Sequence, residues 1–460
     1  MRKLVLGLTL LFLAMPVAAG DLGWRAVEQE AAERLVAYLQ IDTSNPPGNE
    51  LRATRFFQEW FEAEGIAVEI DEFEPGRTNL VARLAGNGAG RPLLLMNHTD
   101  VVTADPTRWR VAPFSGAVLD GYVCGRGALD MKGEGLVQAM VFVLLKRAQV
   151  PLNRDVYFIA TADEEVAFRG AFRLMEKKSE LLREAEFILT EGGLNLVEDG
   201  WLCFVGVDNA EKAPFWLRLR ARGTPGHGSR PLPDAATHRL VRALARVAAW
   251  ETPIEILPGV ERLFRDLAAQ EPSGRAEKFR QLREAVQNPS FLASLTSDPA
   301  YNYLLRNTVS ITVLEGGPQT NVIPGEAVAH LDVRLLPGQS HEKFLAELRT
   351  VLADDTIVIE MLQDRYRPAT SSPTDTAVVR AIEAVVAERF PGRLVTTRML
   401  NGYTECGILR DLGPYCYGFS PFLLDRTEGA SVHGGNERVS VENLQRGLRF
   451  YYDVVEHLVR

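Results

Sequence analysis

Apolar runs alternate with predicted helices through the first part of the chain. Residues 92–96, 155–160 and 187–190 are apolar nearly throughout, which predicts strands that are buried on both faces. Helices are predicted between them, over residues 133–148 and 171–179. The alternation of such strands with helices predicts an α/β fold with a mostly parallel sheet that helices cover on both faces.

The pattern changes near Pro214. Residues 215–221 alternate apolar and polar side chains, as an antiparallel strand with one exposed face does. Further strands are predicted at 308–314, 327–335 and 356–361, and helices at 235–250, 260–295 and 341–352. These segments predict a small α+β domain inserted into the larger one. The resulting division is 20–212 and 366–460 for the larger domain and 213–365 for the insert.

Composition and charge narrow the class of protein. The chain has 460 residues, of which 46% are hydrophobic and 24% are charged, as in ordinary soluble globular proteins. Its length exceeds what one hydrophobic core usually supports, which agrees with two domains. The formal net charge of -9, without a basic tract, argues against nucleic acid and anionic membrane surfaces as partners.

Residues 1–19 have the pattern of a secretory signal peptide. Arg2 and Lys3 precede a largely apolar run at 4–15, and small residues follow it. The run is too short to span a bilayer as a helix, and cleavage is expected after Ala19. We expect a periplasmic or secreted protein without a stable membrane anchor.

The cysteines are widely spaced and form no C-x-x-C pair, which argues against a metal site made of thiolates. Export permits disulfides, but four cysteines can pair in three ways and the sequence selects none of them. The residues are Cys124, Cys203, Cys406 and Cys416.

Three consecutive carboxylates end the predicted strand at 155–160. Asp163, Glu164 and Glu165 repel one another unless a positive charge lies nearby. An isolated acidic triplet is usually a solvated loop. The alternative is a metal site, in which one carboxylate binds the ion and its neighbour accepts a proton from water.

Other metal-ligand side chains also follow apolar runs. Taken singly, each has an ordinary structural explanation, such as a helix cap for an aspartate in a glycine-rich loop. Ligands, however, bind at the carboxyl ends of strands in open α/β sheets, and mixed oxygen and nitrogen donors suit a pair of bridged metal ions. The joint pattern therefore predicts a two-metal site. The additional candidates are His98 with Asp100, Asp130, Glu191 and His433.

At this point the chain resembles the M20 metallopeptidases, a family that includes aminoacylase-1, acetylornithine deacetylase, succinyl-diaminopimelate desuccinylase and glutamate carboxypeptidase. The resemblance implies a zinc-hydrolase catalytic domain with an inserted ferredoxin-like dimerisation or lid domain. It covers essentially the whole mature chain, in the same order. The motifs that carry it are residues 94–100, 125–132, 163–165, 190–193 and 223–229.

The resemblance implies a role for each metal-site candidate. Asp130 would bridge two zinc ions, for which cobalt or manganese could substitute. His98 and Glu191 would complete one site, and Glu165 and His433 the other. Two further roles are implied. Glu164 would be the general base, and Asp100 would support His98.

Three residues of the insert also match the family. His227 would reach across a homodimer to stabilise the oxyanion, and Asn321 and Arg334 would contact the substrate, the arginine by gripping a carboxylate. Without the family, His227 reads as a loop histidine in a glycine turn. Arg334 would equally fit the solvated face of a strand.

The implied activity is hydrolysis of the amide bond in N-acyl-amino acids or short peptides with a free carboxylate. Glu191, where the family's dipeptidases have aspartate, resembles the aminoacylases and deacylases. The alternatives are a carboxypeptidase or dipeptidase of the same family and, from another class, an exported solute-binding protein that performs no catalysis. The sequence departs from the family's Gly-Gly-Thr-Asp turn at residues 401–406, where Tyr403 and Glu405 are expected to alter specificity.

Overall fold

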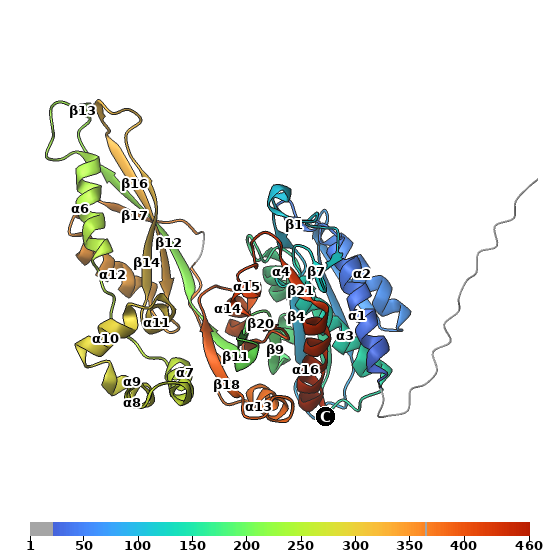
Figure 1. Ribbon diagram of the computed structural model, residues 1–460. Helices are drawn as coiled ribbons and strands as arrows, with labels where there is room; N and C mark the ends of the chain where they lie inside the picture. Colours follow the sequence, from blue (N-terminus) through green and yellow to red (C-terminus); the bar gives the residue numbers. More distant parts are fainter. Residues whose placement is uncertain (1–21, 364–365) are drawn as a thin grey trace, which may run out of the picture.

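The computed structural model describes residues 22–363 and 366–460, which form two lobes (Figure 1). The larger lobe is built from both ends of the chain, and the smaller one from its middle. The expected signal peptide, residues 1–19, lies outside the described residues. Within the described part of the chain, no helix is both long and apolar enough to cross a membrane.

A mixed sheet of ten strands, counted over the described residues, forms the centre of the larger lobe. Its middle strands lie parallel in the order β8 (Val156–Thr161), β4 (Leu93–His98), β9 (Phe187–Thr190) and β19 (Tyr415–Gly418). The predicted parallel arrangement thus describes the middle of the sheet, and antiparallel pairs flank it. The flanking strands are β2 (Val68–Glu74) and β3 (Arg77–Leu84) on one side, and β11 (Trp201–Glu211), β10 (Leu194–Glu198), β20 (Leu423–Leu424) and β18 (Leu394–Leu400) on the other.

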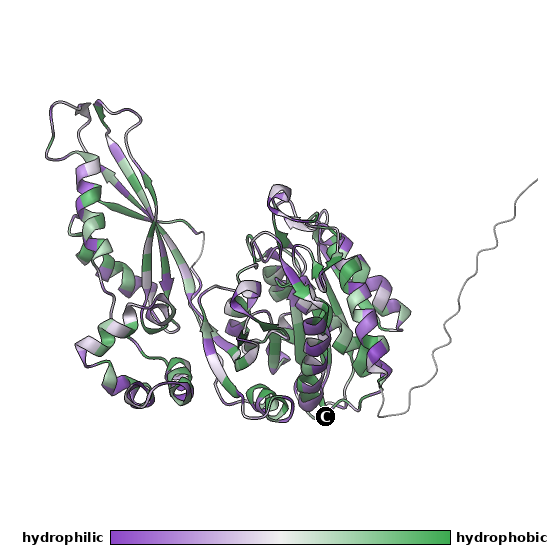
Figure 2. Cartoon of the chain, in the orientation of Figure 1, coloured by the Kyte–Doolittle hydropathy of each residue, from purple (hydrophilic) through white to green (hydrophobic). Residues whose placement is uncertain are grey.

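Helices cover both faces of this sheet, as the apolar strands predicted. Leu93 and Leu95 of β4 enter one core, and Leu94 and Met96 enter another, because successive side chains of a strand point to opposite faces. Figure 2 shows the hydrophobic residues concentrated between the layers. The first core is covered by α1 (Trp24–Leu39), α2 (Leu51–Ala63), α3 (Lys132–Arg147), α13 (Ala377–Arg389) and α16 (Val441–Val459), and the second by α4 (Arg169–Lys177), α5 (Ser179–Glu184) and α14 (Glu405–Leu409).

The smaller lobe is an antiparallel sheet with two helices on one face. Its strands alternate buried and more exposed residues, which is why the sequence pattern identified them. At the end far from the larger lobe, β13 (Gly226–His227) pairs with β15 (Val322–Ile323) (Figure 1). The sheet order is β14 (Thr308–Glu315), β16 (Glu326–Leu335), β12 (Ala213–Arg222) and β17 (Val358–Met361), with α6 (Ala236–Ala248) and α12 (His341–Leu352) packed on it.

The charged helical stretch predicted at 260–295 is a series of short helices with a core of its own. That core includes Ala210 of β11 and Met399 of β18, so the helices pack against the strands that lead into and out of the larger lobe. Part of the insert is therefore fixed to the larger domain. The helices are α7 (Pro258–Leu267), α8 (Ser273–Arg280), α9 (Leu282–Ala285), α10 (Pro289–Thr296) and α11 (Pro299–Leu305).

Cys406 and Cys416 form a disulfide, and Cys124 and Cys203 are free thiols. The bond joins α14 to the first part of β19, at the second core of the larger lobe. It selects one of the pairings that the sequence left open.

Candidate active site

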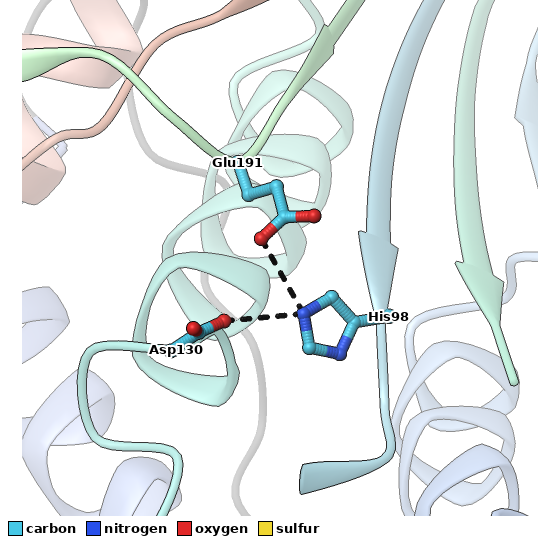
Figure 3. Close-up of side chains that lie close together, drawn as sticks. All are labelled: His98, Asp130 and Glu191. Carbon is cyan, nitrogen blue, oxygen red and sulfur yellow. Dashed lines mark hydrogen bonds and ion pairs between the residues drawn. The ribbon is translucent and has the colours of Figure 1, made fainter. Parts of the chain in front are cut away.

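Two groups of metal-ligand side chains share Asp130. His98 Nε2 lies 3.2 Å from Asp130 Oδ1 and 3.6 Å from Glu191 Oε2 (Figure 3). On the other side, His433 Nε2 lies 3.1 Å from Asp130 Oδ2 and 3.3 Å from Glu165 Oε2. The donor atoms of each group lie within 4.8 Å of one another. The two oxygens of Asp130 thus face two separate groups of donors, as a carboxylate that bridges two cations must.

The ends of adjacent strands bring these residues together. His98 is the last residue of β4, and Glu191 directly follows β9. Glu165 lies in the turn after β8, which pairs with β4 in parallel register. Asp130 precedes α3, and His433 lies in the loop after α15 (Arg426–Gly429). Because the carboxyl ends of parallel strands meet at one edge, residues far apart in sequence face a common point.

The loop that carries Asp130 is held by the carboxylate of Glu437. This side chain is fully buried and accepts hydrogen bonds from the backbone N–H of Leu129 at 2.8 Å and of Asp130 at 3.1 Å. It also accepts a hydrogen bond of 2.7 Å from Arg126 Nη1. Glu437 is four residues beyond His433, so one carboxylate connects the two loops. The sequence showed an acidic residue near His433 but not its burial, so this role was missed.

Asp100 supports His98 mainly through its main chain. His98 Nδ1 lies 2.9 Å from the Asp100 carbonyl oxygen and 3.6 Å from its carboxylate. A proton on Nδ1 donated to that carbonyl leaves Nε2 free to face a cation. The carboxylate instead accepts hydrogen bonds from the backbone N–H of Glu164 at 3.1 Å and of Glu165 at 3.2 Å. Asp100 therefore positions both the histidine and the two glutamates.

Asp163 turns away from the metal-ligand groups. Its carboxylate accepts hydrogen bonds from Arg77 Nη2 at 2.6 Å, Asn45 Nδ2 at 2.8 Å and Arg169 Nε at 2.7 Å. Its φ of 67° lies in the left-handed region, which directs the following residues toward the site. Two arginines thus neutralise the first of the three carboxylates, and repulsion within the triplet is relieved there.

The remaining carboxylates concentrate negative charge in a buried volume. Burial and the charge of Glu191 raise the pKa of Glu164 well above its ordinary value. Hydrogen bonds with Asp130 and Glu165 raise the pKa of His433 to about 10. Burial also raises the pKa of Glu165, although its hydrogen bond with His433 opposes this. Protons are thus held where a divalent cation would displace them.

Two further observations fit a metal ion. Glu165 Oε1 is buried and has no hydrogen-bond partner among the described residues, so this oxygen is available as a ligand. Glu164 as a whole residue is 8% exposed, and no hydrogen bond joins its carboxylate to another described residue. Both glutamates therefore keep carboxylate oxygens that no other described residue engages through a hydrogen bond.

A cleft of about 710 Å³ opens beside these groups. From the smaller lobe, Arg334 and Trp216 line it. Arg334 Nε donates to Asp332 Oδ1 at 2.8 Å, and Trp216 Nε1 donates to the same oxygen at 3.1 Å. Arg398 of β18 also lines the cleft and lies 3.5 Å from Asp208. Arg398 matched no motif, because a lone arginine in a strand gives no sequence signal.

His227 and Asn321 lie elsewhere. His227 belongs to β13 at the far end of the smaller lobe (Figure 1), and neither residue lines the cleft. The two are neighbours, since the N–H of Gly228 donates to the carbonyl of Asn321 at 2.7 Å, and both are exposed. In this structure a single chain therefore does not bring His227 and Asn321 to the metal-ligand groups.

The chain is similar to a family model and to proteins of known sequence. A family model described as peptidase family M20/M25/M40 matches residues 94–457. The N-fatty-acyl-amino acid synthase/hydrolase PM20D1 of Xenopus tropicalis is 30% identical over 382 residues, which are 80% of this chain and 72% of that protein. Aminoacylase-1 of Mus musculus is 26% identical over 426 residues, which are 92% of this chain and 93% of that protein.

Solved structures share the fold. The M20 family metallo-carboxypeptidase Sso-CP2 from Sulfolobus solfataricus has a TM-score of 0.69 at 18% identity, covering 93% of this chain and 98% of that one. YXEP of Bacillus subtilis, described as a dinuclear metal binding peptidase, has a TM-score of 0.58 at 14% identity and covers 95% of this chain and 99% of that one. The fold is therefore shared over nearly the whole length of each chain.

Proposed function

Because the chain belongs to peptidase family M20/M25/M40, a family of metallohydrolases, we propose that it is an exported di-zinc amidohydrolase that cleaves N-acyl-amino acids with a free carboxylate. The observation that carries this proposal is the position of Asp130 between two groups of ligands, with the unpartnered carboxylate of Glu164 beside them. A protein that only binds solutes needs no such base.

The donor set fits two zinc ions. Two imidazoles and three carboxylates suit a borderline divalent metal, and cobalt or manganese could substitute for zinc. Bound there, the ions would polarise the substrate carbonyl and lower the pKa of a water molecule. His98 and Glu191 would hold one ion and Glu165 and His433 the other, with Asp130 shared.

Glu164 acts as the proton carrier in this proposal. Its main chain is held by Asp100, and its side chain lines the cleft. It would accept the proton of the attacking water and return it to the leaving amine as the amide bond breaks. This assignment leaves Glu165, with its short contact to His433, as the ligand of the pair.

Arg334 would hold the free carboxylate of the substrate. It lines the cleft from the smaller lobe, and Asp332 orients its guanidinium group, which suits bidentate recognition of a carboxylate. His227 would stabilise the oxyanion in the cleft of a second copy, with Asn321 beside it. Both residues are exposed at the tip of the smaller lobe, which supports a homodimer in which the tip of each chain reaches the cleft of the other.

Export is supported by two features. The first is the signal-peptide pattern of residues 1–19. The second is the disulfide between Cys406 and Cys416, a bond that persists in oxidising compartments such as the periplasm. N-acyl-amino acids are proposed as substrates because PM20D1 and aminoacylase-1, by their names, act on acylated amino acids.

A hydrolysis panel tests the proposal. Purified protein is assayed with N-acyl-amino acids and dipeptides, with chelator and after zinc is restored. We expect release of free amino acid from the N-acyl substrates, loss of activity with chelator and recovery with zinc. Cleavage of dipeptides alone would make the protein a dipeptidase, and no zinc-dependent cleavage of any substrate would contradict the proposal.

A further inference from the structure

A second cavity, of about 390 Å³, adjoins the cleft. Phe168, Trp216 and Tyr403 line both spaces, so one continues into the other. Val166, which also lines both, directly follows the proposed ligand Glu165. The cavity therefore begins next to the reacting centre.

The walls of this cavity are mainly apolar. Of the described residues that line it, only Arg367 is charged, and its guanidinium carbon lies 4.5 Å from the centre of the Phe172 ring. The amide of Gln363 is engaged with main-chain groups of Pro214 and Trp216. The remaining lining residues are Val166, Ala167, Phe168, Tyr403 and Ile408.

Tyr403 forms one wall because residue 407 is glycine. A Cβ at position 407 would lie 2.3 Å from Tyr403 Cε2, so any larger residue would displace the ring. The ring packs edge-on against Phe168, with centroids 5.8 Å apart. Thr404, the next residue, is anchored to Glu211 through its N–H at 2.6 Å. Tyr403 thus occupies a fixed position in the segment where the sequence departs from the family's usual turn.

Large apolar side chains of the cavity lining, and one next to it in sequence, are exposed. Val166 is 56% exposed and Trp216 is 44% exposed, and both line the cavity. Leu362 is 37% exposed and its N–H donates to the Trp216 carbonyl at 2.9 Å. Exposed apolar surface that continues into a proposed active site is typical of a site for an apolar ligand.

We propose that this cavity binds the acyl chain of the substrate, so that the enzyme prefers long apolar acyl groups over acetyl. The inference rests on the proposed function. With the amide carbonyl beside Glu165 and the carboxylate held by Arg334, the acyl group extends past Val166 and Phe168 into the cavity. Burial of the chain against Phe172 and Tyr403 stabilises the bound substrate and the transition state alike, which raises kcat/KM.

The test uses zinc-loaded protein and the N-acetyl, N-hexanoyl and N-decanoyl derivatives of one amino acid. Each methylene that becomes buried is expected to raise kcat/KM about fourfold, so three buried methylenes raise it on the order of sixtyfold. Ala167 is exposed and lines only the cavity, not the cleft. Ala167→Trp fills the cavity and should bring the ratio of decanoyl to acetyl kcat/KM close to one, whereas Ala167→Ser, the matched control, should keep the wild-type ratio.

The binding of decanoate and of acetate, measured by calorimetry, tests whether the cavity holds an acyl chain independently of whether the protein catalyses hydrolysis. Decanoate should bind the wild type and the Ala167→Ser variant more tightly than acetate, and Ala167→Trp should abolish the difference. If no acyl-amino acid or dipeptide is cleaved, the proposed function fails, and decanoate binding alone then decides whether the cavity holds an acyl chain. Three results would overturn the inference: equal binding of the two acids, a chain-length preference that survives Ala167→Trp, or a preference for N-succinyl substrates through Arg367.

Discussion

The carboxylate of Asp100 accepts a hydrogen bond from the backbone N–H of Glu164 at 3.1 Å. Its other oxygen accepts from the N–H of Glu165 at 3.2 Å and from Asn45 Nδ2 at 2.8 Å. Through its own carbonyl, Asp100 also contacts His98 Nδ1. One buried aspartate thus connects the proposed metal ligands at the ends of β4 and β8 and fixes the proposed proton carrier.

Asp100→Asn tests this connection. The side-chain amide of asparagine has only one oxygen. Its NH₂ group must therefore face an N–H donor whose hydrogen bond the second carboxylate oxygen of Asp100 accepts in the wild type. We expect kcat to fall by about 10- to 100-fold. Bound zinc should be largely retained, because the main-chain carbonyl still contacts His98. Steady-state kinetics and metal analysis check this, with the exposed Asp375→Asn as control; an unchanged kcat in Asp100→Asn would contradict the role.

Glu437→Gln should destabilise the protein and weaken metal binding. The substitution removes the charge that pairs with Arg126, which is 3% exposed, and weakens the hold on the loop that carries Asp130. Breaking a buried ion pair in this way costs about 3 kcal/mol of unfolding free energy. Zinc affinity should fall by about 10- to 100-fold.

Urea unfolding of the zinc-free protein and competition with a chelator give these two quantities. The matched control is Glu442→Gln in α16, whose carboxylate is largely exposed and whose ion pair with Arg446 contributes at most about 1 kcal/mol. Equal effects of the two substitutions would show that Glu437 does not hold the loop.

How far the sequence could predict this site depends on the kind of residue. His98 ends a strand and Glu191 directly follows one, and both strands are largely apolar, so their position at the edge of a parallel sheet followed from the pattern. Glu437 and Asp163 carry no such pattern, because their burial against Arg126 and Arg77 depends on contacts between distant parts of the chain. The same limit applies to Tyr403, whose position depends on the space at Gly407 and on the anchor at Glu211.

The unfolding free energy of the protein is expected to depend on pH because of the buried carboxyl of Glu405. Burial raises the pKa of this carboxyl to about 8, although its hydrogen bond from Thr161 and the charge of His98 oppose the rise. The folded protein therefore retains this proton above pH 4.5, where the unfolded chain releases it. The stability contributed by the proton is complete below about pH 4.5 and is lost as the pH rises toward 8.

Glu405→Gln, which mimics the protonated form, should remove that loss. The variant should be more stable than the wild type by on the order of 4 kcal/mol at pH 8 and nearly equal to it at pH 4.5. Urea unfolding with chelator present, at both pH values, measures the difference. A difference that does not grow with pH would contradict the prediction.

Complementation between two inactive variants tests the role of His227 across a dimer. His227→Ala and Glu164→Gln are each expected to be inactive. When the two chains are co-expressed, a mixed dimer contains one site with both native residues, because the tip of one chain serves the cleft of the other. Random pairing then predicts about a quarter of wild-type activity. Absence of activity in purified mixed dimers would contradict this arrangement.

The central claim, that Glu164 is the proton carrier of a two-zinc site, is tested most directly by measuring bound zinc and turnover together in Glu164→Gln. The account predicts two zinc ions per chain, as in the wild type, and a fall in kcat of about 100- to 10,000-fold. The control Glu176→Gln, whose side chain is 69% exposed, should change neither quantity. A Glu164→Gln protein that loses its zinc, or that keeps both its zinc and its turnover, would contradict the account.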